Sequence, residues 1–204
     1  MDFEDQVIHR TKLGDYVKDK VLSLNHFMDN YCKNQEYTIP SLMALSNALR
    51  YLQRYEFNGN HGEWVHTVKP DLGPGISERV SEAVRTTGEN VGACQAAMAE
   101  LRSSLGSLLE VGYRILAIPT VPGPPPKLCT EASTSETFRA RAFSLLAIAG
   151  MSGFCQVSIP LGMYNGLPVA VSLIARHGSD MFLLNLVKTL CSTLKEQAEI
   201  AEQL

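Results

Sequence analysis

Residues 155–161 and 169–175 are two apolar runs, and the dipeptide Asn165-Gly166 lies between them. Asn and Gly both tolerate positive φ angles, so this pattern predicts two antiparallel strands joined by a tight turn. The first run alternates between apolar and polar residues, as a strand with one buried face does. The second is apolar on both faces, which is typical of a strand covered above and below. Because so apolar a hairpin is not stable alone in water, we expect it inside a larger sheet.

The rest of the chain predicts mainly helices. Leucines recur at helical spacing between residues 42 and 52, and Asn58-Gly59-Asn60 then provides a stop signal. Ser133-x-x-Glu136 matches a capping box, which predicts a helix that runs from there to residue 149 with Leu146 facing inward. Further elements are expected as helices over 77–85 (capped by Ser77), 90–110 and from 180 onward, and as a short strand over 115–118.

This order of elements divides the chain into sections. Residues 1–40 are weakly specified, with 17–29 as a modest helical candidate. Residues 41–112 are mainly helical, and residues 113–204 follow the order strand, helix, hairpin, helix. The pattern predicts an α/β fold in which helices cover a mixed β-sheet with a central antiparallel hairpin. No internal repeat is visible, and 204 residues could form one domain or two small ones.

The composition argues against several classes of protein. A net charge of −3 and a pI near 6.0 give no basic surface for nucleic acid. No apolar run approaches the roughly 20 residues of a membrane-spanning helix, and the acidic N-terminus lacks the layout of a signal peptide. The 5 cysteines are odd in number and widely spaced, which favours reduced thiols over disulfides or a zinc site. We therefore expect a cytoplasmic protein without a nucleic-acid partner, a membrane span or a cofactor.

Short motifs that could carry chemistry have better structural explanations. His61-Gly-Glu63 matches the first half of a zinc-deaminase signature, but the Cys-x-x-Cys half is missing. We expect a surface turn there, with Trp64 as its aromatic anchor. Ser192-x-x-Lys195 has the spacing of penicillin-binding enzymes without their companion motifs, so a solvated helix face explains it better.

Three further motifs are equally weak. His177, Ser179 and Asp180 are the residue types of a catalytic triad, but triads are assembled from distant parts of a chain, so helix capping is the better explanation. Gly73-Pro-Gly75 lacks the lysine and additional glycines of a phosphate loop. Cys155 lies on an expected strand and should be buried and inert, unless a neighbouring His or a helix terminus lowers the pKa of its thiol. The residues alone therefore predict no catalytic residue and no metal ligand.

Longer segments resemble the C-terminal half of amidase-signature enzymes. They are Ile118-Pro-Thr-Val-Pro-Gly-Pro-Pro-Pro126, Ala149-Gly-Met-Ser-Gly-Phe-Cys-Gln-Val-Ser-Ile-Pro-Leu-Gly162 and Gly166-Leu-Pro-Val-Ala-Val-Ser-Leu-Ile-Ala175. Residues 60–65, 69–75 and 176–180 resemble the plant branch of that family. That branch includes indole-3-acetamide-hydrolysing amidases and the amidase-like domain of a chloroplast outer-envelope import receptor. The resemblance covers most of the chain. It implies that residues 1–204 are the C-terminal portion of a single amidase-like domain with a partial amidase-signature α/β/α fold.

Enzymes of this family use a serine nucleophile, a second serine in a cis peptide and a lysine base, all in a Gly/Ser-rich region of the N-terminal half. A lysine kept neutral by its surroundings can accept the proton from serine, and backbone N–H groups bind the oxyanion. This sequence has no such Gly/Ser-rich stretch and no lysine that matches the base. The resemblance therefore implies a fragment, splice product or truncated gene product that lacks the triad and its N-terminal half.

The resemblance also implies a place and a reaction. Two groups of residues are expected near the acyl pocket of the intact domain: Pro119, Thr120 and Val121, and the turn Gly150, Met151, Ser152 and Gly153. The implied reaction is hydrolysis of a small carboxamide, such as indole-3-acetamide to indole-3-acetate, and the chain alone is expected to be inactive. The alternative is a non-catalytic interaction module like that of the import receptor, although no helical repeat of roughly 34 residues is visible. A binding protein unrelated to amides also stays open.

Overall fold

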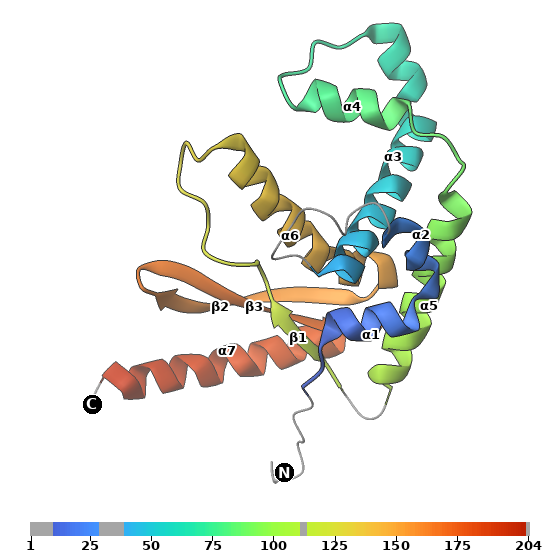
Figure 1. The fold of residues 1–204 in the computed structure, drawn as a ribbon. Coiled ribbons are helices and arrows are strands. Elements are labelled where there is room, and N and C mark those ends of the chain that lie inside the picture. Colours follow the sequence, from blue (N-terminus) through green and yellow to red (C-terminus); the bar gives the residue numbers. More distant parts are fainter. Residues whose placement is uncertain (1–9, 29–38, 111–113, 203–204) are drawn as a thin grey trace.

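The computed structural model describes residues 10–28, 39–110 and 114–202 (Figure 1). Its helices are α1 (Leu13–Lys20), the short 3₁₀ helix η2 (Leu22–Leu24), α2 (Asn25–Met28), α3 (Pro40–Val68), α4 (Ile76–Val84), α5 (Val91–Leu108), α6 (Ala132–Ser152) and α7 (Asp180–Glu202). Its strands are β1 (Leu116–Pro119), β2 (Cys155–Tyr164) and β3 (Leu167–Ala175). In this described part of the chain, no helix has the length and apolar character needed to cross a membrane.

The predicted hairpin forms most of the sheet. β2 and β3 pair in antiparallel register as far as Tyr164 opposite Leu167. Asn165 and Gly166 make the turn between them with φ angles of 50° and 75°. Positive φ at both central residues is what a type I′ turn requires, so the hairpin predicted from Asn-Gly is confirmed. Each strand is longer than the apolar run that predicted it.

β1 lies on the other side of β3, which gives the sheet order β1-β3-β2. It pairs with β3 in the antiparallel sense, with Pro119 opposite Val171. Proline has no N–H to donate to a ladder, so an edge strand is where a segment that ends in Pro119 can lie. Both described pairings are antiparallel. The sequence predicted a mixed sheet, but no parallel pair is present among the described residues.

The sheet is the middle of three layers. Because side chains alternate along a strand, β3 has two different faces. Leu173 and Ala175 on one face pack with Leu183 of α7. Ile174 on the other face, together with Ile118 of β1, joins the larger core that contains side chains of α1, α3, α5 and α6. Figure 1 shows α7 on one side of the hairpin and α6 on the other. The predicted α/β fold, with helices covering the hairpin, is confirmed.

The hairpin is covered along only part of its length. Residues 172–175 of β3 are buried, whereas Val169 and Leu167 are each 39% exposed and Met163 is 67% exposed. Figure 1 shows α6 leading away from the sheet toward its own N-terminal end, so this face of the turn region lacks a helical layer. The expectation that the whole second strand is covered on both faces is therefore wrong for its first half.

α3 is longer than the sequence predicts. The helix continues through Asn58-Gly59-Asn60 and ends only before Lys69, which adopts a left-handed conformation with φ 49°. The predicted stop fails because contacts with the following segment hold this region helical: the Asn58 amide donates to the Thr86 carbonyl, 3.4 Å away. Trp64 consequently lies on a helix and is half exposed. The predicted surface turn with Trp64 as its anchor is therefore wrong.

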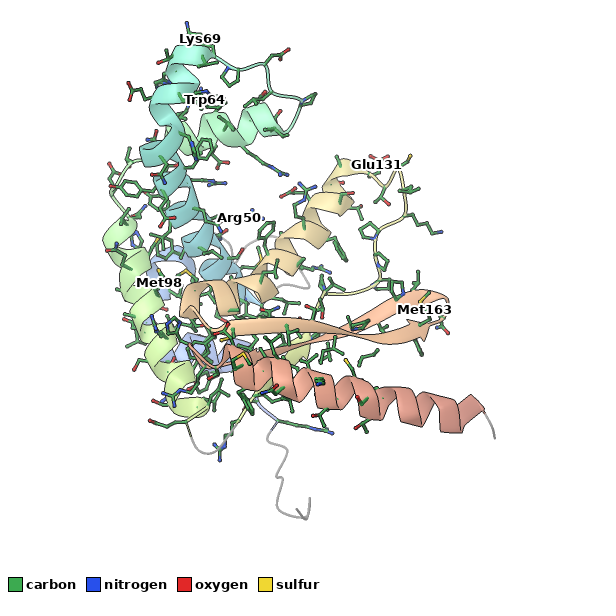
Figure 2. The ribbon with its side chains drawn as sticks, turned by 180° about the vertical axis from the view of Figure 1, so that it is seen from behind. Arg50, Trp64, Lys69, Met98, Glu131 and Met163 are labelled. Atoms are coloured by element: carbon green, nitrogen blue, oxygen red, sulfur yellow. The ribbon has the colours of Figure 1, made fainter. Side chains whose placement is uncertain are left out.

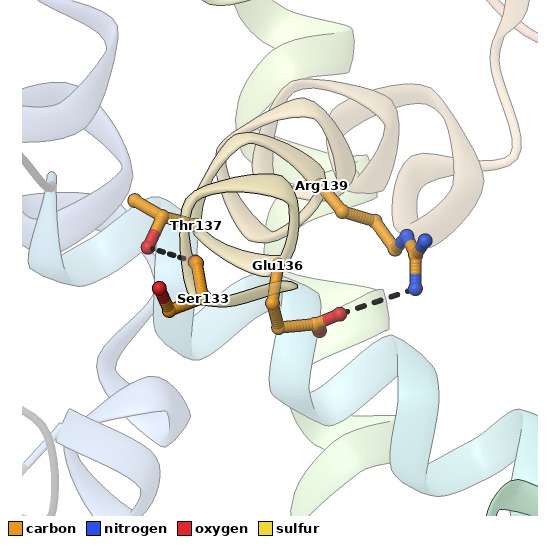
Figure 3. A network of polar contacts seen from close by, with 4 residues as sticks. All are labelled: Ser133, Glu136, Thr137 and Arg139. Carbon is orange, nitrogen blue, oxygen red and sulfur yellow. Dashed lines mark hydrogen bonds and ion pairs between the residues drawn. The ribbon is translucent and has the colours of Figure 1, made fainter. Parts of the chain in front are cut away.

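α6 begins without the predicted capping box. Its N-cap is Glu131, and no side chain caps the helix. Ser133 and Glu136 already lie within the helix (Figure 3). The Thr137 hydroxyl donates to the Ser133 carbonyl at 3.0 Å, and Glu136 forms an ion pair with Arg139 at 3.1 Å. Ser133 is therefore not in the non-helical position from which a side chain caps a helix.

Other boundaries differ in detail. α4 is preceded by Gly75 at φ 78°, and not by Ser77, whose hydroxyl donates to the Leu72 carbonyl at 2.6 Å. Leu146, predicted to face inward, is 46% exposed because the buried face of α6 is formed by the neighbouring positions 144, 147, 148 and 151. α5 forms as predicted. Gly112, expected to end it, lies outside the described residues, as does residue 29 at the end of the first helical candidate.

Candidate functional site

A cavity of about 320 Å³ lies between α3, α4 and α6. Its lining includes four arginines and two phenylalanines, namely Arg50, Arg54, Arg79, Arg139, Phe57 and Phe143. Figure 2 shows Arg50 on the side of α3 that faces α6. Small-molecule sites are typically concave, largely apolar and supplied with a few polar groups, so this cavity is the candidate site of the described structure.

Helical spacing explains why these side chains come together. Arg50, Arg54 and Phe57 are one turn apart along α3, so they lie on one face of that helix. Arg139 and Phe143 are likewise one turn apart on α6. The cavity forms where these two faces meet the side of α4.

Close packing holds the three helices in place. α6 approaches α3 at Gly150, where an added Cβ would lie only 3.0 Å from a methyl group of Leu49. The segment after α4 is held against α3 by the Tyr51 hydroxyl, which donates to the Thr87 carbonyl at 2.7 Å. Gly150, predicted to line the acyl pocket, therefore lies in the structure where α6 and α3 pack together.

The charges in the cavity are only partly paired. Arg54 forms an ion pair with Glu82 at 2.7 Å, and Arg139 pairs with Glu136. The Arg50 guanidinium instead lies over the Phe143 ring, 4.5 Å from its centroid, which is a cation–π contact. Neither Arg50 nor Arg79 has an ion-pair partner among the described residues. The cavity therefore carries positive charge that the described carboxylates do not neutralise.

The environment of Arg50 reflects this imbalance. Burial lowers the pKa of the Arg50 guanidinium, and the positive charges of Arg54 and Arg79 lower it further. The negative charges of Glu136 and Glu82 act in the opposite direction, and the effect of Glu136 is the largest after burial. Arginine stays protonated in proteins, so Arg50 keeps its charge, and the lowered pKa means that holding this charge in the cavity costs electrostatic free energy. A negatively charged ligand would reduce that cost.

A row of hydroxyl groups crosses the sheet at Pro119–Val121, the first segment predicted to line the acyl pocket. The hydroxyls of Thr120 and Ser172 lie 2.9 Å apart, and those of Ser172 and Ser158 lie 3.0 Å apart. Ser172 is fully buried. A buried hydroxyl is costly unless it is hydrogen-bonded, so the two flanking hydroxyls account for a serine at this position. Thr120 thus has a role in the sheet, next to Pro119 and Val121 at the end of β1.

The second segment predicted to line the acyl pocket, Gly150–Gly153, forms the C-terminal turn of α6 and the residue after it. Met151 is buried in the main core. The Ser152 hydroxyl donates to the Ile148 carbonyl at 2.7 Å. Gly153 ends the helix at φ 67°, a conformation that favours glycine, and its carbonyl accepts from His177 at 2.8 Å.

The structure does not bring the two predicted segments together. Pro119 is level with Ile159, because both lie opposite Val171. Gly153, by contrast, precedes the far end of β2, where Cys155 lies about 13 Å along the strand from Ile159. None of the residues predicted to line the acyl pocket lines the cavity between α3, α4 and α6. Their place in an acyl pocket stays a prediction.

The weak motifs have structural roles. His61 lies in α3 with its ring 5.0 Å from that of Phe57, and no cluster of His, Cys, Asp and Glu among the described residues could hold a metal ion. Ser192 donates to the Lys188 carbonyl on its own helix at 3.1 Å, and the Lys195 side chain lies outside the described part.

Cys155 is half-buried, so the prediction that it is buried is wrong, but its surroundings favour an unreactive thiol. Its Sγ lies 3.2 Å from the Arg176 carbonyl, to which it donates. Burial raises the pKa of the Cys155 thiol, and nearby Asp180 raises it further. Because the thiolate is the nucleophilic form, both effects oppose reactivity at neutral pH.

Known proteins resemble this chain over most of its length, although no family model matches it. It is 53% identical over 197 residues to Amidase 1 of Oryza sativa subsp. japonica, and the aligned residues cover 96% of this chain and 45% of that relative. It is 55% identical over 189 residues to Amidase 1 of Arabidopsis thaliana, covering 91% and 44%. It is also 42% identical over 199 residues to Translocon at the outer membrane of chloroplasts 64 of Pisum sativum, covering 98% and 33%. The chain thus spans less than half the length of these relatives.

Solved structures share the fold. A crystal structure of an amidase superposes with a TM-score of 0.64 at 20% identity, covering 88% of this chain and 44% of that one. Allophanate hydrolase of Kluyveromyces lactis gives a TM-score of 0.61 at 19% identity, covering 90% and 30%. The likeness in sequence to plant Amidase 1 and the likeness in fold to solved amidases place the chain in the amidase-signature family, as a segment that resembles its C-terminal half.

Proposed function

We propose that this chain is the scaffold and pocket-wall part of a hydrolase that cleaves C–N bonds of small carboxamides. The observation that carries the proposal is the 53% identity to rice Amidase 1 over 96% of the chain. In this proposal the serine nucleophile, the second serine and the lysine base belong to an N-terminal half outside this chain. Removing a catalytic triad typically costs about 10⁶-fold in rate, so the chain alone should be inactive.

The substrate is proposed from the plant-like motifs, and the location from the odd number and wide spacing of the cysteines, which favour reduced thiols. Indole-3-acetamide, a precursor of the auxin indole-3-acetate, is the proposed substrate, and the cytoplasm the proposed site of action. The segments at Pro119–Val121 and Gly150–Gly153 would lie near the acyl group once the other half completes the domain.

A chimera tests this proposal. The segment of rice Amidase 1 that matches this chain is replaced by the chain, and hydrolysis of a panel of small carboxamides that includes indole-3-acetamide is followed by ammonia release. The chimera should hydrolyse the amides that rice Amidase 1 hydrolyses, and the isolated chain should release no ammonia. A chimera that is folded by circular dichroism and inactive on the whole panel would contradict the proposal.

A non-catalytic interaction module is the second candidate, favoured by the 42% identity to the pea translocon protein. The isolated chain would then capture chaperone C-terminal peptides or envelope proteins in a pull-down experiment. A clean negative against both partner classes would remove this candidate and leave the amidase proposal unaffected.

A further inference from the structure

The cavity between α3, α4 and α6 contains more arginines than paired carboxylates. Arg54 and Arg139 have carboxylate partners, whereas Arg50 and Arg79 have none among the described residues. Arg79 is near enough to influence Arg50 electrostatically. Two guanidinium groups that share a concave site repel each other, and Glu136 and Glu82 offset part of that repulsion at Arg50. A bound anion between the two groups would add an attraction to both.

The same cavity offers apolar surface for a ring. Phe57 and Phe143 contribute aromatic side chains from α3 and α6, and Val80 and Ala83 contribute aliphatic ones from α4. The Arg50 guanidinium lies over the Phe143 ring, so its charge is held beside the aromatic surface. A planar guanidinium in this position can donate two parallel hydrogen bonds to a carboxylate.

We propose that this cavity binds a small aromatic carboxylate, with its ring against Phe57 and Phe143 and its carboxylate between Arg50 and Arg79. A volume of about 320 Å³ is at the small end of ligand pockets, which suits one ring system with a short acidic side chain. Indole-3-acetate is a member of this class. The inference goes beyond amide hydrolysis, because binding an acid requires no bond-breaking group.

Both features of the ligand are needed. A neutral arylacetamide would leave Arg50 and Arg79 without a counter-ion, and acetate alone would leave the phenylalanine rings exposed. Glu136 is the carboxylate within the lining that would repel an acid, and its pairing with Arg139 reduces this repulsion. We therefore expect a preference for molecules that combine a ring with a negative charge.

Isothermal titration calorimetry of the purified chain with indole-3-acetate, indole-3-acetamide and acetate tests the proposal. At roughly 50 mM salt, indole-3-acetate should bind at least about tenfold more tightly than either of the others, as expected for charge-assisted hydrogen bonds. Raising the salt concentration should weaken this binding, because the attraction is electrostatic.

Single substitutions assign the binding to the cavity. Arg79→Gln, at an exposed position on α4, should weaken indole-3-acetate binding about tenfold without unfolding the chain. Arg50→Lys keeps the charge but loses the planar group that stacks on Phe143, so it should also weaken binding. Arg85→Gln is the matched control, because Arg85 is an exposed arginine at the end of α4 that does not line this cavity. Circular dichroism spectra confirm that each variant is folded.

Four results would overturn the proposal. They are no binding of indole-3-acetate up to millimolar concentration, equal affinity for the acid and the amide, equal affinity for acetate, and equal losses in the Arg79 and Arg85 variants. These outcomes are distinct from failure of the amidase proposal. An inactive chimera combined with arginine-dependent binding of the acid would leave the site in place, and an active chimera without such binding would remove the site alone.

Discussion

Ile174 is the residue through which the central strand packs against the helical core, so truncating it tests the three-layer arrangement. The side chain is fully buried, with Leu116 and Gln156 opposite it on the two neighbouring strands. Ile174→Ala removes about three buried carbon atoms, each worth about 0.8 kcal/mol in transfer free energy. The cavity left behind adds to this loss, so the free energy of unfolding should fall by about 3–4 kcal/mol.

Equilibrium urea unfolding, followed by far-UV circular dichroism, measures the effect. With a denaturant slope of about 2 kcal/mol/M, the midpoint of Ile174→Ala should fall by about 1.5–2 M. Ile174→Val should cost about 1 kcal/mol, which keeps the test readable if the alanine variant does not fold. The matched control is Val169→Ala on the same strand, where the side chain is 39% exposed and the loss should stay below about 1 kcal/mol. Equal losses at residues 174 and 169 would refute the packing of this face against the helices.

Three other changes test local features. Gly59→Ala should raise the free energy of unfolding by about 0.5–1 kcal/mol, because Gly59 lies inside α3 with open space around it, and a lower melting temperature would contradict a continuous helix. Gly166→Ala should lower it by about 1–2 kcal/mol in urea titrations, because a side chain is strained at φ +75°, and an unchanged midpoint would contradict the turn conformation. Iodoacetamide at pH 8 should alkylate exposed Cys129 well before Cys94, as read by peptide mass spectrometry. Burial raises the pKa of the Cys94 thiol to about 11, so little thiolate forms at pH 8 and more forms only as the pH rises toward that value; equal rates would contradict its burial.

Local sequence signals predicted the elements that neighbouring residues determine. Asn165 and Gly166 adopt the positive φ angles that their types favour, and the apolar runs beside them form paired strands. The regular spacing of Leu101 and Leu105 likewise matches the buried face of α5. In these cases the residues that give the signal are also those that form the structure.

Sequence signals gave the wrong helix boundaries where contacts between distant segments determine the structure. Asn58 reads as a helix stop, but its side chain contacts the carbonyl of Thr86 and the helix continues. Ser133 reads as a cap, but α6 begins earlier and uses that residue within its first turn. Covalent neighbours alone do not contain this information.

The arginine-lined cavity was missed because it depends on three helices. Arg50 and Arg54 are four residues apart, a spacing that predicts a shared helix face. Their partners Arg79 and Phe143 come from α4 and α6, and nothing in the local pattern indicates that these helices meet. The signal that could have suggested the cavity is the occurrence of arginines and aromatic residues at helical spacing in more than one helix.

Covalent labelling tests most directly whether the bond-breaking groups lie outside this chain. The purified chain is incubated with a serine-reactive, amide-mimicking inhibitor beside rice Amidase 1 as the control, and both are analysed by intact-mass spectrometry. We predict an inhibitor adduct on the control and none on the chain. A stoichiometric adduct on any side chain of these 204 residues would contradict the account.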